Sequence, residues 1–510
     1  MGNSSLAASI HILDDDSLLN VFHLYRPHLL GEDGDEGGRQ IGGREGWDRG
    51  RWWYRLSHVC QRWKRVILGS ASYLGVSLVC TNGTPVADML AHSPPLPLVI
   101  EYVIGNEAIS TEDEEGAILA LMQYDRVSRV RLFMPATSLQ KLIVAMDDDY
   151  PILEYLIIVR PPEDKNSICC QFPETLQAPN LRHVYLAGFA LPIGSRLLTT
   201  AVGLVALCLV MIHPSTYFHP NILLRWLSLM PQLETLIVYF SFPVPNRDVE
   251  RQLTHMPITT PITLSNLHYF DFRGVRTYLE ALVHRITALR LEKLRIFFFN
   301  QLTFSFTRLL QFVDATENFA FKSATFNFSD RYVLAEVYPH EEAKMYALSI
   351  TVDCWHLDWQ VSSAAQIFNS LSPLFSAVEH LTLQHEVHSQ SSEEHNEADR
   401  TKWRQLLGSF RNVKTLRVDE GLVEELSRCL ELDHGELPLE VLPELQELTY
   451  FGSGNTGDAF TSFIDARQVT GRPVSLVRHG PRPDRSSAVS SLEPPSTTPA
   501  GDKAGSDPDT

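Results

Sequence analysis

The sequence predicts an α/β protein in which short strands and helices repeat along most of the chain, after a small helical unit and before a disordered tail. An apolar pattern recurs from residue 127 to residue 450, and two apolar helical stripes precede it. Residues 481–510 contain six prolines and six serines with almost no large apolar side chains, which is typical of disorder. A chain of 510 residues, 44% of them hydrophobic, is long enough for several domains or for one repeat array.

The first 75 residues predict a helical unit, after a flexible N-terminus at 1–9. Within residues 10–75, an apolar helical stripe is formed by Leu18, Leu19 and Phe22. Asp14–Ser17, just before this stripe, offer side-chain oxygens for the first amides of a helix. We therefore expect a short helix to begin there.

A second amphipathic helix is expected after a long polar insert. Residues 31–51 hold eight glycines and ten charged side chains, which is too little apolar surface to order them. The second stripe then falls at i, i+3, i+4 and i+7, at Leu56, Val59, Cys60 and Trp63. Two such helices bury a small core, so we expect them to pack on another surface.

The rest of the chain repeats the apolar pattern L-x-x-L-x-L. Its starting residues are 23 to 35 residues apart, with a mean near 29, at the long end of the range for leucine-rich repeats. The patterns lie at Val127-Val130-Leu132, Leu153-Leu156-Ile158, Leu181-Val184-Leu186, Leu204-Leu207-Leu209, Leu233-Leu236-Val238, Leu267-Phe270-Phe272, Leu291-Leu294-Ile296, Phe321-Ala324-Phe326, Met345-Leu348-Ile350, Val378-Leu381-Leu383, Val413-Leu416-Val418 and Leu445-Leu448-Tyr450.

Stacking of such units predicts a divergent leucine-rich-repeat solenoid, or horseshoe, across residues 127–480, with 76–126 as a connecting region. Each unit supplies a strand whose alternate side chains point into the coil, and one unit alone cannot bury them. Helix-like stretches between strands include Asn221–Ser228 and Thr307–Ala315. The Asn usual after the strand of such repeats is mostly absent, so the repeats are divergent.

Charge and cysteine content exclude several kinds of partner and site. The chain has 43 Lys and Arg against 61 Asp and Glu, and its net charge of −18 argues against nucleic acid and anionic membranes as partners. Its seven cysteines include no CxxC pair, so neither a disulfide framework nor a zinc ribbon is expected. This usage fits a reducing compartment, cytoplasmic or nuclear.

No export, lipid or membrane signal is expected either. Residues 1–9 lack the basic segment and apolar run of a signal peptide, and Leu6 stands where myristoylation needs Ser or Thr. The uncharged, mostly apolar stretch Leu197–Ile212 has 16 residues, whereas a bilayer span needs ~20. We expect a buried strand and helix there instead.

The helical unit resembles an F-box. ILDDDSLLNVFHLYRP and WWYRLSHVCQRWKRVILGSASYLG follow the pattern of a Leu-Leu-x-x-Ile-Phe-type helix and a later Val-Cys-x-x-Trp. With TPVADMLAHSPPLPLVIEY and DAFTSFIDARQVTGRPVSL, nearly the whole chain is similar to the large F-box-like families, with divergent leucine-rich repeats, of mushroom-forming (basidiomycete) fungi. Asp14 stands where the F-box proline usually sits, and residues 31–51 split the motif. The matching positions are Leu18, Leu19, Val21, Phe22, Leu56, Val59, Cys60, Arg62 and Trp63.

This resemblance implies a substrate-recognition adaptor of a Skp-cullin-F-box ubiquitin ligase. The F-box would bind a Skp-type linker protein and through it a cullin, and the repeats would bind a target protein. The chain would then be no enzyme and would need no cofactor. Two alternatives stay open: the Leu56–Trp63 stripe only covers the first repeat, or a degenerate F-box leaves a stand-alone leucine-rich-repeat scaffold. The implied linker-binding residues are Leu13, Leu18, Leu19, Phe22, Leu56, Val59, Cys60 and Trp63.

The third and fifth positions of each pattern point away from the core and predict a target-binding face. Several are Arg or aromatic, the types enriched at interface hot spots. Their positive charge predicts an acidic or phosphorylated target segment. A merely solvated face, or a phase shifted by one residue, is the alternative. The predicted residues are Arg129, Arg131, His183, Tyr185, Thr235, Tyr269, Asp271, Lys293, Arg295 and Arg417.

Two further motifs have a chemical interpretation. GSGNTG at 452–457 is a G-x-G-x-x-G string, but the acid that would hold a ribose ~20 residues later is missing, so a glycine-rich turn fits better. His385, His388 and His395 lie among glutamates in the polar stretch 385–402, without the spacing of a closed zinc site. We expect a surface loop there, no metal site and no catalytic residues.

Overall fold

The computed structural model describes residues 13–26, 52–161, 170–192, 194–212, 217–241, 261–299, 303–316, 318–386, 399–431, 441–451 and 459–480. Two compact units account for them, the first ending at Val76 and the second beginning at Ser77. The predicted flexible N-terminus at 1–9, the insert 31–51 and the tail 481–510 lie outside the described residues.

The first unit is helical, with α1 packed on α4. Its helices are α1 (Asp15–Tyr25), α3 (Trp52–Ser57), α4 (Gln61–Gly69) and α5 (Ala71–Leu74). α1 begins after Asp14, whose carboxylate accepts a hydrogen bond from the Ser17 amide at 2.7 Å; this bond lowers the pKa of Asp14. Between α1 and α4, the rings of Phe22 and Trp63 meet edge to face with centroids 5.0 Å apart. The core of this unit therefore consists of the residues that formed the two apolar stripes.

The prediction of one continuous helix across Leu56–Trp63 is wrong, because the helical conformation is interrupted between Ser57 and Gln61. The Ser57 hydroxyl donates to the Tyr54 carbonyl at 2.8 Å, and Cys60 is extended with φ −161° and ψ 166°. Serine side chains that bond to nearby backbone compete with helix formation. The helix therefore stops at Ser57 and a new one starts at Gln61.

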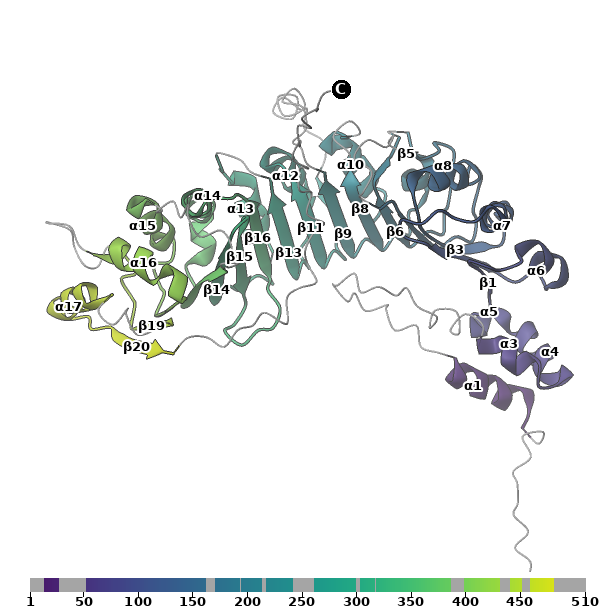
Figure 1. The fold of residues 1–510 in the computed structure, drawn as a ribbon, viewed down its shortest axis with the longest axis horizontal. Coiled ribbons are helices and arrows are strands. Elements are labelled where there is room, and N and C mark those ends of the chain that lie inside the picture. The colour runs from purple at the N-terminus through teal and green to yellow at the C-terminus, as the bar shows by residue number, and fades with distance from the viewer. Residues whose placement is uncertain are drawn as a thin grey trace, which may run out of the picture. The chain divides into compact units, whose positions relative to one another are not determined.

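The second unit is built on one sheet, which has sixteen strands in the described part of the chain. In spatial order these are β1 (Leu78–Cys80), β2 (Leu98–Val103), β3 (Val127–Phe133), β4 (Tyr155–Val159), β6 (His183–Ala187), β8 (Ala206–Ile212), β9 (Thr235–Phe240), β11 (Tyr269–Gly274), β13 (Lys293–Phe298), β16 (Leu348–Asp353), β15 (Tyr332–Tyr338), β14 (Ser323–Ser329), β17 (His380–Glu386), β18 (Thr415–Val418), β19 (Glu447–Phe451) and β20 (Ser475–His479). The second and third apolar positions of each of the twelve predicted patterns lie on one of these strands. The predicted α/β class is confirmed, since the sheet is mostly parallel and alternates with helices (Figure 1).

The sheet extends beyond the twelve patterns at both ends. β1 and β2 lie within residues 76–126, which we expected to be a connecting region; β1 pairs in parallel with β2, and β2 with β3. At the other end, β20 pairs in parallel with β19. Two short parallel pairs lie outside this sheet: β5 (Cys170–Gln171) with β7 (Phe189–Ala190), and β10 (Ile262–Thr263) with β12 (Ile286–Thr287).

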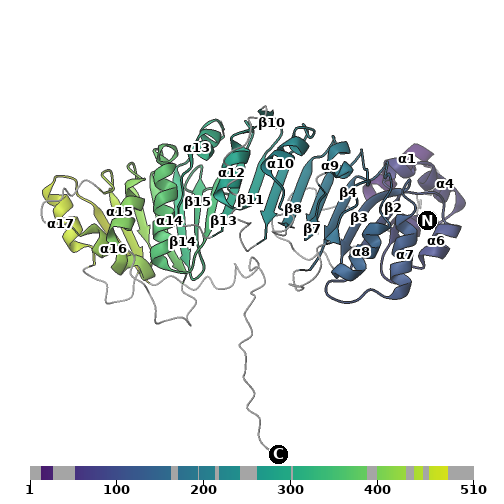
Figure 2. The same ribbon diagram turned by 90° about the horizontal axis from the view of Figure 1, so that it is seen from above.

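The helices of this unit lie along one face of the sheet (Figure 2). They are α6 (Val86–His92), α7 (Thr111–Leu121), α8 (Ala136–Val144), α9 (Arg196–Thr200), α10 (Pro220–Leu227), α12 (Arg276–Val283), α13 (Thr307–Asp314), α14 (Leu357–Ser370), η3 (Ser372–Phe375), α15 (Arg400–Gly408), η4 (Glu420–Leu422), α16 (Val423–Leu430) and α17 (Thr461–Val469). The helix-like stretches predicted at Asn221–Ser228 and Thr307–Ala315 correspond to α10 and α13. The uncharged stretch Leu197–Ile212 forms most of α9 and all of β8.

The core of the second unit lies between the helices and the sheet face that they cover. On β3, for example, Val130 and Leu132 are buried there, while Arg129 and Arg131 alternate onto the opposite face. Aromatic rings join the layers: Phe326 of β14 meets Phe368 of α14 with centroids 4.7 Å apart. We call the sheet face opposite the helices the open face.

One strand runs against the others. β14, β15 and β16 form an antiparallel meander, and β16 rather than β14 pairs with β13. β14 in turn pairs in parallel with β17. The order of these strands in space is therefore the reverse of their order in the chain, so the regular repeat is interrupted here.

Candidate functional site

Strand register places the predicted target-binding residues in two neighbouring rows across the open face. The first row runs through Arg129, Tyr155, His183, Ala206, Thr235, Tyr269 and Lys293. The second row runs through Arg131, Ile157, Tyr185, Cys208, Ile237, Asp271 and Arg295. Arg417 also belongs to the second row, but β16, β15, β14 and β17 separate it from Arg295. The structure thus brings nine of the ten residues onto neighbouring strands from β3 to β13.

Asp271 is the centre of the most closely connected cluster on this face. Although it lies on the open face, it is only 2% exposed. Its carboxylate accepts hydrogen bonds from the hydroxyls of Tyr239 at 2.5 Å and Tyr269 at 2.8 Å, and Nη1 of Arg295 lies 3.9 Å away. These groups come from three adjacent strands, β9, β11 and β13. The carboxylate is therefore satisfied internally and holds the two tyrosine rings in place.

Electrostatics keep Tyr239, Tyr269 and the nearby Cys208 protonated at neutral pH. Burial raises the pKa of both Tyr239 and Tyr269, and the charge of Asp271 and the hydrogen bonds to it raise these pKa values further. Burial, together with the Asp271 charge, raises the pKa of the Cys208 thiol to about 12. The hydroxyls remain donors and the thiol remains protonated. This arrangement suits a recognition surface.

Stacked rings and cations line the first row on either side of this cluster. The rings of Tyr155 and His183 are parallel within 5°, with centroids 4.4 Å apart, and the Arg129 guanidinium lies 4.3 Å from the Tyr155 centroid. On the other side, the Lys293 ammonium lies 4.7 Å from the ring centroid of Tyr346. Such contacts hold the side chains in defined positions. The row therefore offers a rigid aromatic surface.

The expected acidic or phosphorylated target is not supported by the charges of this face. Arg131 pairs with Glu101 at 3.0 Å, and Arg417 pairs with Glu341 at 2.9 Å. The Asp271 carboxylate lies near Arg295, as described above. Three of the five predicted cations thus already face acids of this chain, which lowers their attraction for a second acid.

Several residues of this surface were missed by sequence reasoning. Tyr155 occupies a third position of the repeat pattern, so the pattern itself could have identified it. Tyr239 lies just beyond the last position of its pattern, and Glu341 lies in the turn between β15 and β16. Extending the alternation of outward-facing positions by two residues, from Ile237 onward, would have identified Tyr239. For Glu341 the sequence carries no comparable signal.

The predicted linker-binding residues divide into core and surface. Leu18, Phe22 and Trp63 are buried within the helical unit itself, so we correct their assignment from partner contacts to core positions. The physical reason is that the unit is small and needs these largest apolar side chains to pack its own helices. The accessible remainder consists of Leu13, Leu19, Leu56, Val59 and Cys60, which are exposed or half-buried.

An exposed apolar stripe on α1 was not among the predicted site residues. Val21, Leu24 and Tyr25 are 42%, 81% and 57% exposed, and their i, i+3, i+4 spacing puts them on one side of the helix. The sequence did indicate this second stripe, because apolar residues lie on two sides of the same helical segment. Only the packing of α1 on α4 shows which side is free.

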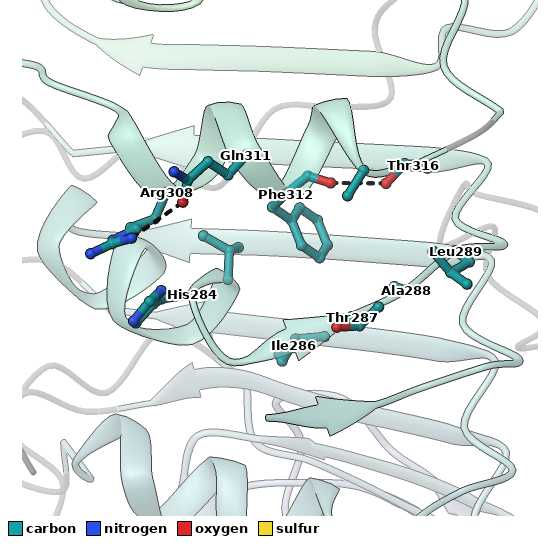
Figure 3. Close-up of a pocket in the computed structure, with 11 residues that line it drawn as sticks. His284, Ile286, Thr287, Ala288, Leu289, Arg308, Gln311, Phe312 and Thr316 are labelled. Atoms are coloured by element: carbon teal, nitrogen blue, oxygen red, sulfur yellow. Dashed lines mark hydrogen bonds between the residues drawn. The ribbon is translucent and has the colours of Figure 1, made fainter. Parts of the chain in front are cut away.

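A small hollow lies on the helix side of the sheet, between α12, β12 and α13 (Figure 3). Its volume is about 150 Å³, well below the range of ~300–1,000 Å³ for small-molecule sites. His284 and Arg308 lie at one end, and burial together with Arg308 and Arg285 lowers the pKa of His284. The hollow contains none of the predicted site residues.

The other predicted motifs fall largely outside the described residues. GSGNTG at 452–457 lies there, as do His388 and His395, while β17 runs through His385 to Glu386. Within the described ranges, no cluster of His, Cys, Asp and Glu could hold a metal ion. No helix in those ranges has the length and apolarity needed to cross a membrane.

The chain has no match among protein-family models and none among curated proteins. Its function is therefore inferred from the two surfaces described above, the α1 stripe and the open face.

Proposed function

We propose that this protein is the substrate-recognition adaptor of a Skp-cullin-F-box ubiquitin ligase. Its helical unit binds a Skp-type linker, which connects it to a cullin, and the open face of its sheet binds a target protein. Other subunits supply the ubiquitin-transfer chemistry, so this chain needs no cofactor. Such an adaptor acts in the cytoplasm or the nucleus, where ubiquitin ligases of this class work.

The observation that carries this proposal is the exposed stripe of Val21, Leu24 and Tyr25 on α1. A helical unit this small has little apolar surface to spare, yet three large side chains of one helix face solvent. Each Å² of apolar surface removed from water contributes ~25 cal/mol, which favours burial of the stripe against a partner. Val59, also exposed, adds to the apolar surface of the unit.

For the target, the open face favours recognition by hydrogen bonds and aromatic contact more than by charge. Tyrosine hydroxyls and a stacked Tyr-His pair are adapted to this, because aromatic side chains bury much area at low entropic cost. The ion pairs of Arg131 and Arg417 leave less positive charge than the sequence alone indicated.

The test is direct binding between the purified full chain and a purified fungal Skp-type linker. Leu24→Asp places a charge in the middle of the stripe and is expected to weaken binding by more than about tenfold, the effect of losing one interface anchor. Gln61→Asp adds the same charge to an exposed position of α4, outside the stripe, and is the matched control. Equal binding of both variants and wild type contradicts the assigned linker surface.

The second candidate function is a stand-alone scaffold that binds proteins without a ligase. It is favoured by the burial of Leu18, Phe22 and Trp63, because residues that match the F-box pattern then have a purely structural reason to be present. The same binding experiment separates the two functions. A helical unit that is folded by hydrogen exchange but does not bind the linker supports the scaffold.

A further inference from the structure

Two tryptophans, Trp355 just after β16 and Trp359 in the first turn of α14, are exposed to an unusual degree. Trp355 is 62% and Trp359 is 51% exposed, whereas the other tryptophans of the described ranges, Trp52, Trp53, Trp63, Trp226 and Trp403, are at most 8% exposed. Tryptophan is the side chain most enriched at interface hot spots. Two exposed tryptophans this close in the sequence leave a large apolar surface in water, which is unfavourable unless a partner covers it.

A guanidinium group lies against the first of these indoles. The tip of the hairpin between β14 and β15 carries Arg331, whose Cζ lies 5.3 Å from the ring centroid of Trp355. The ring of Trp359 in turn rests edge-on against His356, with centroids 4.9 Å apart. Among the described residues, the half-buried Asp353 interacts electrostatically with Arg331.

The backbone around these side chains is held rigidly. The buried amide of Gln360, on α14, donates to the Ser329 carbonyl at 2.6 Å and to the Cys354 carbonyl at 2.9 Å. The Cys354 amide donates to the Arg331 carbonyl at 2.9 Å. Three elements are thus joined beneath the surface: the hairpin tip, the end of β16 and the start of α14. The fold therefore fixes the backbone from which Arg331 and Trp355 project.

We propose that Arg331, Trp355 and Trp359 form a docking site for a peptide segment of a partner protein that carries a large apolar or aromatic side chain next to one acidic residue. The indoles supply the contact area for the apolar side chain. The guanidinium can stack on the indole with its face and bind a carboxylate with its edge. In an adaptor this segment belongs to the target, but the site itself does not depend on the linker.

The charges around the site limit the acidic content of the segment. Asp353, which interacts with both Arg331 and Arg273, is half-buried, and Asp358 accepts a hydrogen bond from the Asp399 amide at 3.2 Å. With these carboxylates nearby and a net charge of −18, a long acidic tract or a second copy of the chain is repelled. A single acid beside an apolar anchor fits best.

Fluorescein-labelled peptides test this site on the full chain. The probe has Glu-Phe at its centre in a Gly/Ser background, and the comparison peptides have Lys-Phe or Glu-Ala there. We expect the Glu-Phe peptide to bind at least about tenfold more tightly than the other two, and to shield the exposed indoles from acrylamide quenching. Equal anisotropy titrations for all three peptides would overturn the proposal.

Substitutions at the site, including a charge reversal of Arg331, provide a second test. Arg331→Glu should weaken the Glu-Phe peptide by at least about tenfold and strengthen the Lys-Phe peptide, while Arg290→Glu, at an exposed position far along the chain, should change neither. Trp355→Ala should weaken every Phe-containing peptide. All these side chains are exposed, so the melting temperature should stay at the wild-type value. Unchanged binding by the Arg331 variant refutes the acidic half of the proposal, and unchanged binding by the Trp355 variant refutes the apolar half.

Discussion

Replacing Asp271 by Asn tests whether the cluster on the open face is held by a buried charge. Asn has nearly the same shape, so the change removes charge rather than volume. Hydrogen bonds to a charged group contribute about 1.5–3 kcal/mol, and neutral ones about 0.5–1.5 kcal/mol. Asp271 accepts two such bonds, at 2.5 and 2.8 Å. The change is therefore expected to cost about 2 kcal/mol of unfolding free energy. Arg295 adds little to this figure, because its side chain is 36% exposed and solvent screens its charge.

Urea denaturation followed by circular dichroism measures this loss, and hydrogen exchange on β9, β11 and β13 locates it. Asp125→Asn, the same chemical change at an exposed position, is the control and should leave both readouts unchanged. A double-mutant cycle with Tyr269→Phe should give a coupling energy of about 1 kcal/mol. If Asp271→Asn unfolds within about 0.5 kcal/mol of wild type, the carboxylate does not organise the cluster and our account of this surface is wrong.

Three further predictions concern single contacts. Burial lowers the pKa of His219, whose Nδ1 accepts a hydrogen bond from the Asn221 amide at the start of α10. The neutral imidazole therefore stabilises the fold above its ordinary pKa of 6.5, and this stabilisation is lost as the pH falls below that value. His219→Asn keeps a hydrogen-bond acceptor that does not titrate, so its melting temperature should drop less than that of wild type between pH 7.5 and pH 5.5. Trp63→Ala should cost about 3–5 kcal/mol and abolish hydrogen-exchange protection in the helical unit while the sheet stays protected. Glu341→Gln should lower stability by less than about 1 kcal/mol, with no difference in high salt, because its ion pair with Arg417 is exposed.

The strands of the sheet were predictable because burial on one face leaves a strict mark on the sequence. Positions such as Val130 and Leu132 must be apolar, and the residues between them need not be, so the twelve patterns locate strands and phase together. Met345 is the exception, since it opens a pattern and is exposed. Met345 lies in the turn between β15 and β16, and no helix separates these two strands.

The candidate site was less predictable, since it depends on which side chains meet. The sequence indicates that Arg417 and Arg131 face outward, but not that Glu341 and Glu101 lie beside them. Likewise Leu18 and Phe22 were predicted from the sequence to bind a partner, and only packing shows that they form the core. Cross-chain contacts of this kind leave no periodic signal.

The antiparallel hairpin was missed for a related reason, and its geometry explains how a repeat can acquire a new site without losing its core. β15 alternates with the same period of two as its neighbours, so Glu336 continues the second row between Ser349 and Thr325. The core face is preserved, while the carboxyl edge changes: where an ordinary repeat leaves its strand to enter a helix, β14 turns back at once through Asp330 and Arg331. Arg331 in this short turn lies against the indole of Trp355, which follows β16. The hairpin that interrupts the repeat therefore also supplies one residue of the proposed docking site.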